Sequence, residues 1–208
     1  MRWPHSMQQL LDRFEQNMRR VENLVTLYTP AGQGRQPLNQ TDLLRAAIVM
    51  LHASLEDFLR ELQLFTLRDA SREALARYSL PGRGGKDVVK FTVADLSDYQ
   101  DLKVIELIEK SAREYHMNHS TFNSGAQVVG ALQNAGIDRL RIDLLPINII
   151  DEMTKRRHNI VHHADRNQES KGRGHHRVQT IKPATVTMYV QAVRQLKNAV
   201  KQQFSEPT

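Results

Sequence analysis

The sequence predicts an all-α protein, an antiparallel helical bundle of four long helices plus shorter inserted helices. Apolar residues recur at steps of three and four through most of the 208 residues, as they do in amphipathic helices. Alternating runs typical of strands are nearly absent, and polar segments with Gly or Pro separate the helical stretches. The length suits one domain with a full core, so we expect residues 1–208 to form a single helical unit.

The first half of the chain predicts two long helices. The first spans about residues 7–28, and a loop at 30–37 containing Gly32 and Gly34 follows it. Thr41 or Asp42 is expected to cap the second helix, which reaches residues 66–69. This second helix has the clearest apolar stripe of the chain: Leu44, Ile48, Leu51, Leu55, Phe58, Leu62 and Phe65.

The middle of the chain predicts shorter elements. A short helix at 71–78 precedes a Gly-rich break at 80–86, which is not a Walker A loop because Asp87 follows Lys86 where Ser or Thr is needed. Residues 88–93 suggest a short extended segment, and the helical period returns over about 97–117. A polar link at 118–125, in which Asn123 is expected to cap a helix, leads to a helix ended by Gly136.

Two more helices complete the expected bundle. One begins near Pro146, a residue that suits the first turn of a helix, and the other spans about 184–204. The stripe of the first comprises Ile149, Ile150, Met153, Ile160, Val161 and Ala164. A polar loop at about 165–182 separates the two helices.

Composition narrows the classes of protein that are possible. The chain has no cysteine, which excludes disulfides, thiolate zinc sites and thiol nucleophiles. No apolar run approaches the roughly 20 residues of a membrane span, and the N-terminus has no apolar signal segment. We therefore expect a cytoplasmic protein that does not bind membranes.

The net charge of +6 is concentrated in one segment. Residues 155–182 hold eight Lys or Arg against two Asp or Glu, so they account for the whole excess, and five of the nine histidines lie there too. A basic segment of this kind favours phosphate-bearing partners, although a solvated loop without a partner has the same composition. The cations after the helix that starts near Pro146 are Arg166, Lys171, Arg173 and Arg177.

Arg157 interrupts the apolar stripe of that helix, with His158 beside it and His162 one turn further on. A guanidinium on a core-facing line requires a partner. It could instead extend to the surface or bind the carbonyls of a neighbouring helix, and the histidines could be a solvated face. Glu56 is a possible ion-pair partner across the bundle. His158 and His162 also have the spacing of zinc ligands on a helix, with His175 and His176 nearby, but no Glu follows His158 as in metalloproteases.

The run Arg157-His158-Asn159-Ile160-Val161-His162 resembles the signature of HEPN domains, in which a His follows an Arg after four to six residues and Asn, Asp or His often follows the Arg directly. Residues 53–59, with Leu55-Glu56 before Phe58, are similar to the long early helix of these domains. The link at 121–124 and the helix ending at 135–137 resemble an inserted segment of the RiboL-PSP-like branch.

The resemblance implies a metal-independent endoribonuclease without a cofactor, acting as a symmetric dimer whose motif helices meet at the two-fold axis. Arg157 would bind the scissile phosphate, His162 would act as general acid or base, and His158 would support it or carry a second proton. Arg156 and His163 would hold RNA together with the basic loop. A toxin or defence effector, silenced by an antitoxin or regulatory protein, fits this class. The alternative is a non-catalytic HEPN module that binds RNA, a nucleotide or a partner protein.

Overall fold

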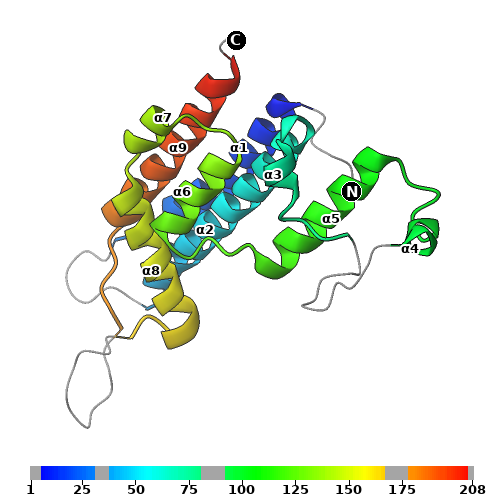
Figure 1. Ribbon diagram of the computed structural model, residues 1–208. Coiled ribbons are helices and arrows are strands. Elements are labelled where there is room, and N and C mark those ends of the chain that lie inside the picture. Colours follow the sequence, from blue (N-terminus) through cyan, green and yellow to red (C-terminus); the bar gives the residue numbers. More distant parts are fainter. Residues whose placement is uncertain (1–5, 31–37, 81–91, 167–177, 206–208) are drawn as a thin grey trace.

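The computed structural model describes residues 6–30, 38–80, 92–166 and 178–205, and within these ranges all regular elements are helical, which confirms the all-α class. The long helices in Figure 1 are α1 (Met7–Thr26), α2 (Leu38–Thr66), α5 (Val104–His119), α8 (Ile147–His163) and α9 (Pro183–Ser205). The shorter ones are η1 (Leu67–Asp69), α3 (Arg72–Leu75), α4 (Val93–Ser97), α6 (Gly125–Asn134) and α7 (Arg139–Asp143). An isolated antiparallel bridge joins Arg166 to Val178.

Helix α2 is the centre of the bundle, because it packs against α1, α8, α9 and α6 (Figure 1). The stripe expected on this helix is confirmed: from Leu44 to Leu62 its six members are at most 2% exposed, and Phe65 packs against the same core. Burying each of these side chains contributes roughly 1.5–3 kcal/mol. The helices α1, α2, α8 and α9 form the main core together with the shorter α6, which adds Val128, Ala131 and Leu132.

A second, smaller apolar cluster holds α5 to the far end of α2. It contains Leu64 and Leu67 next to Ala112 of α5, with Leu75 and Tyr78 from the α3 region packed against it. Figure 1 shows α4 and α5 extending to one side of the bundle as an arm. The arm thus depends on few buried side chains, whereas the bundle has a continuous core.

The expected helix over 97–117 is wrong at its start, because two separate helices begin in this region, each with a carboxylate at its third position that accepts a backbone hydrogen bond. The Thr92 backbone N–H donates to Asp95 and starts α4, and the Lys103 N–H donates to Glu106 and starts α5. Val93 therefore opens a helix rather than ending an extended segment, while residues 88–91 of that segment lie outside the described ranges.

Two expected helix caps are also wrong. Helix α2 begins at Leu38, so Thr41 and Asp42 lie inside it and accept hydrogen bonds from Arg45. Ser124, not Asn123, caps α6 by accepting a hydrogen bond from the Gln127 N–H. In the described ranges, no helix is both long and apolar enough for a membrane span.

Candidate functional site

Helix α8 ends in an unusual turn that is fixed by a buried carboxylate. Ala164 and Asp165 have φ values of 49° and 56°, a left-handed conformation that is strained for residues with a side chain. The Asp165 side chain is fully buried, and its Oδ2 accepts hydrogen bonds of 2.8 Å from both Arg45 Nε and Arg156 Nη2. These charge-assisted bonds anchor the end of α8 to the start of α2.

Arg156 belongs to this internal cluster, although the sequence predicts it to hold substrate. Its Nη1 donates to Gln179 Oε1 at 2.9 Å and its Nη2 donates to the Thr180 carbonyl at 3.2 Å. The Gln179 backbone N–H in turn donates to the Asp165 carbonyl at 2.8 Å. Arg156 thereby ties α8 to the segment that leads into α9.

Arg157 lies on a different face of α8 and points toward the link that precedes α6. Its side chain is half-buried, and its Nη1 donates to Asn123 Oδ1 across 3.4 Å, a long hydrogen bond. Gly125 brings this link close to α8, because a Cβ on Gly125 would lie 2.8 Å from Ile147 Cγ2. The Gly125 N–H also donates to Asp151 Oδ1 at 2.8 Å. A glycine at position 125 thus lets the link approach α8 closely, two residues after Asn123.

A buried histidine lies behind Arg157. His52 of α2 is 1% exposed, and its Nε2–H donates to the Phe122 carbonyl at 3.1 Å. Burial, and to a smaller extent the positive charge of Arg157, lowers the pKa of His52, whereas Glu56 opposes the shift. Glu56 lies 3.9 Å from His52 Nδ1 and 3.7 Å from Arg60. Between Glu56 and Arg157, both of which are described, the structure contains no ion pair within 4.0 Å.

The other two motif residues face solvent and lie side by side. The His158 and His162 rings, both on exposed side chains, have centroids 4.5 Å apart. His163 is half-buried, with its centroid 5.8 Å from that of His158. The expected apolar stripe is wrong over this last turn, since Val161 is 50% exposed and Ala164 lies outside the helix. The end of α8 therefore presents histidines and a valine to solvent.

Only part of the predicted basic loop can be placed. Arg166 is exposed at its start, where it forms the bridge with Val178. Lys171, Arg173 and Arg177 lie outside the described residues, as do His175 and His176. Within the ranges that the structure describes, no group of three or more His, Cys, Asp or Glu side chains is arranged to hold a metal ion.

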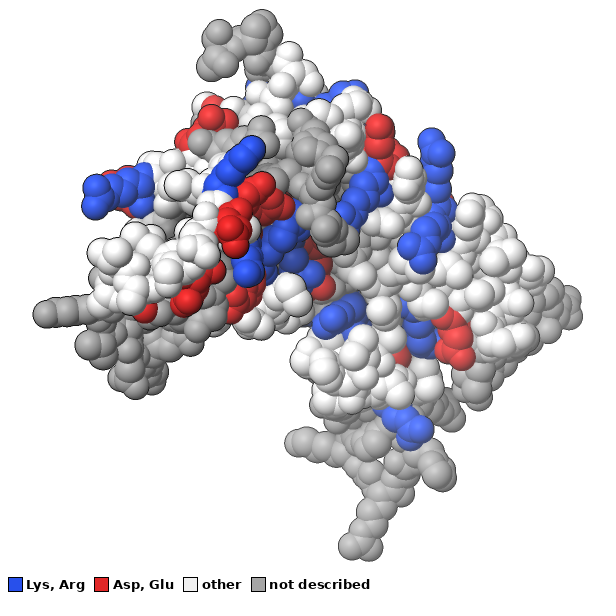
Figure 2. Space-filling model, turned by 90° about the vertical axis from the view of Figure 1, so that its right-hand side faces the viewer, with Lys and Arg blue, Asp and Glu red and all other residues white. Residues whose placement is uncertain are grey.

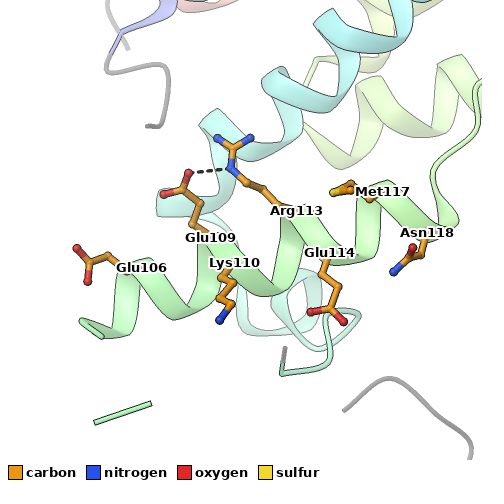
Figure 3. A pocket seen from close by; sticks show the side chains of 7 residues that line it. All are labelled: Glu106, Glu109, Lys110, Arg113, Glu114, Met117 and Asn118. Atoms are coloured by element: carbon orange, nitrogen blue, oxygen red, sulfur yellow. Dashed lines mark hydrogen bonds and ion pairs between the residues drawn. The ribbon is translucent and has the colours of Figure 1, made fainter. Parts of the chain in front are cut away.

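A pocket of about 450 Å³ lies along α5, not at the motif. Figure 3 shows the α5 side chains that line it, with Arg113 bound to Glu109. Its lining holds three glutamates, Glu106, Glu109 and Glu114, and two cations, Lys110 and Arg113. Figure 2 shows acidic and basic side chains interspersed on the face that carries the arm. This charge balance does not favour a phosphate in the pocket.

The sequence alone does not show that four residues lie near Arg156 or Arg157: Arg45, His52, Asn123 and Asp165. His52 follows Leu51 of the stripe, and the sequence pattern does not indicate that its side chain is buried. Nothing in the local pattern pairs Arg45 with Asp165, because the two are 120 residues apart. Asn123 was expected only as a cap. An Asn-Ser pair leaves the capping residue open, and here Ser124 caps α6, which frees the Asn123 amide for Arg157.

The fold and the motif together define the class of protein. The HEPN resemblance implies a helical bundle with an Arg and two histidines on a late helix, and the structure has both features. The comparison with protein families makes this specific, because the sequence model of the RiboL-PSP-HEPN family matches residues 12–206. The chain belongs to the RiboL-PSP-HEPN family. The comparisons with curated proteins and with solved structures give no match.

Proposed function

We propose that this protein is a metal-independent endoribonuclease that cleaves RNA through the ribose 2′-OH. The observation that carries the proposal is the exposed pair of His158 and His162 beside Arg157 on α8, in a chain that belongs to a HEPN family. Imidazoles accessible to solvent can exchange protons with a substrate near neutral pH. A guanidinium suits a phosphate that gains negative charge.

The proposed reaction needs no metal and no cofactor. One imidazole removes the proton of the 2′-OH, and the 2′-oxygen attacks the phosphorus. The bond to the 5′-oxygen of the next nucleotide breaks, and that oxygen takes up a proton, which leaves a 2′,3′-cyclic phosphate and a free 5′-OH. His162 acts as general acid or base, His158 supports it or carries the second proton, and Arg157 stabilises the charge on the phosphorane.

The site is proposed to be composite and dimeric. Residues five apart on a helix differ in direction by about 140°, and Arg157 points to Asn123 while His162 faces solvent. A two-fold axis at the end of α8 brings Arg157 of one protomer toward His162 of its partner. His163 and Arg166, with Lys171, Arg173 and Arg177 of the loop, hold the RNA strand, and Arg156 positions the helix. A toxin or defence role, with an antitoxin or regulatory partner, fits such an enzyme.

The test is RNA cleavage by the purified protein in EDTA, with wild type beside His162→Ala and with analysis of the product ends. Lys155→Ala is the matched control, since Lys155 is exposed on the same helix and, among the described residues, forms a surface pair with Asp151. We expect cyclic-phosphate ends from wild type and from Lys155→Ala, and none from His162→Ala.

Equal cleavage by wild type and His162→Ala would contradict the assignment of the site. Absence of cleavage by wild type, with salt-sensitive RNA binding retained, would favour the non-catalytic HEPN module instead. Sedimentation of the same preparations tests the dimer, and a monomer at high protein concentration would contradict a composite site.

A further inference from the structure

The last turn of α5 carries two stacked rings at the surface. The Tyr115 and His119 rings have centroids 4.9 Å apart and planes inclined by 21°. Tyr115 is half-buried and His119 is exposed, so His119 forms the outer layer of the stack. His119 Nδ1 lies 3.1 Å from the Tyr115 carbonyl, which requires an Nδ1–H donor and fixes the orientation of the ring. Its Nε2 is then free to accept a hydrogen bond in the neutral form.

The inner side of this stack is supported by buried groups. The Tyr78 ring packs edge-on against Tyr115 at 5.2 Å, and His116 packs against Tyr78 at 5.6 Å. His116 is 3% exposed, and burial together with Arg60, Arg77 and Arg113 lowers its pKa to about 4. A neutral, buried His116 belongs to the support. His119, by contrast, is exposed to solvent.

The link after α5 limits how far this stack can lie from the motif. Arg60 of α2 donates to the Ser120 carbonyl at 3.1 Å, and its guanidinium lies 5.8 Å from the centre of the Phe122 ring. Asn123, four residues after His119, then receives the hydrogen bond from Arg157. Four residues span at most about 14 Å, so a short single strand reaches both places. Figure 1 shows the link running from the end of α5 to α6, beside α8.

We propose that Tyr115 and His119 form a stacking site for an unpaired nucleobase of the RNA whose phosphodiester is bound at Arg157. The inference rests on the proposed function for its substrate class, RNA. It adds a subsite that binds a base, in addition to the site that binds the phosphate. Proteins hold unpaired bases by stacking them on exposed aromatic or His rings, in a manner that tolerates different sequences. A base laid on the outer face of His119 extends a stack that is already formed, so little side-chain freedom is lost on binding.

The stack and the basic loop are expected to contribute to RNA affinity with different dependences on salt. A base that stacks on His119 brings no charge of its own to this contact, so few counterions are released when it docks. The part of the affinity that depends on His119 is therefore expected to be insensitive to salt. The part that depends on Arg166, Lys171, Arg173 and Arg177 is expected to fall steeply as salt increases.

The experiment measures RNA affinity in the His162→Ala background of the full chain, which is expected not to cleave the probe. The probe is a fluorescent single-stranded RNA of about twelve nucleotides, compared with a series that carries one abasic site at successive positions. The variants are His119→Ala, His119→Phe, and Met117→Ala as the matched control, because Met117 is 84% exposed on the same helix and outside the stack.

We expect His119→Ala to weaken binding about tenfold, His119→Phe to restore it, and Met117→Ala to leave it unchanged. At one position of the series, the abasic probe should bind wild type as weakly as the intact probe binds His119→Ala. At that position, the abasic probe and His119→Ala together should cause no further loss. Equal affinities of the three variants, additive losses at every position, or no binding of the probe would overturn the proposal. If wild type binds in this manner but never cleaves, the proposed nuclease fails and the stacking site stands.

Discussion

Two faces of α8 carry neighbouring arginines that the structure treats in opposite ways. On one face, which we call the anchoring face, Arg156 binds Asp165, Gln179 and Thr180. We call the rest of the helix surface near its end the motif face. There, among the described residues, Arg157 forms one long hydrogen bond to a neutral amide, and His158 and His162 point in other directions and face solvent. Consecutive residues of a helix point about 100° apart, so adjacent arginines of identical chemistry meet different surroundings.

Charge alone therefore does not identify a substrate-binding arginine in this protein. A guanidinium that is already paired with a buried carboxylate is not available to bind a phosphate. Breaking the pair would leave both charges uncompensated. A guanidinium that binds only an amide can exchange this bond for a charge-assisted bond to phosphate at small loss. The anchoring face is therefore expected to determine stability, and the motif face to determine activity.

The largest expected effect is the loss of RNA cleavage in Arg157→Ala. Removing the group that stabilises the developing phosphorane charge should lower the rate by about 10²–10³-fold, and the free energy of unfolding should change by less than about 1 kcal/mol. Single-turnover cleavage in EDTA and urea unfolding followed by circular dichroism measure the two quantities on the same preparation. A variant that cleaves normally, or one that fails to fold, would remove the distinction between the faces.

The next effect in size is on stability, in Asp165→Asn. This change keeps the shape and a residue type that tolerates positive φ, but it leaves Arg45 and Arg156 without their buried carboxylate. We expect a loss of about 3 kcal/mol in the free energy of unfolding. Asp42→Asn is the matched control, since the Asp42 side chain also pairs with Arg45 but is 65% exposed, and it should change stability by less than about 0.5 kcal/mol. Similar losses in the two variants would contradict the role given to the anchoring face.

The outline of the fold could be predicted from the sequence because helix period and core burial coincide along most of the chain. The stripe from Leu44 to Phe65 is an example: each member lies in or against the core. The starts of helices are harder to predict, since any of several neighbouring polar residues can be the cap. Helix α6, for example, is capped by Ser124 and not by Asn123. Two helices begin in a stretch whose apolar period is continuous, where Asp95 accepts from the Thr92 N–H and Glu106 from the Lys103 N–H.

The site could be predicted only as far as local spacing reaches. Arg157, His158 and His162 stand out in the sequence because they lie close together where an apolar stripe is interrupted. Their surroundings depend on contacts between distant segments: Asn123 is 34 residues from Arg157, and Arg45 is 120 residues from Asp165. No local rule could show that Arg156 would turn inward and Arg157 toward the link, because this depends on how α8 is rotated against α2.

The smallest expected effect reports directly on that rotation. Arg157 lowers the pKa of His52 through its positive charge, in addition to the larger lowering by burial. Arg157→Ala should therefore raise the pKa of His52, while burial keeps it below the ordinary value of 6.5. The titration is followed by NMR of the imidazole carbon-bound protons, with Lys155→Ala as the control because the Lys155 side chain is 74% exposed on the same helix. An unchanged pKa in Arg157→Ala would mean that the guanidinium does not lie beside His52, and the motif face would then lack the buried support that fixes Arg157 for a substrate phosphate.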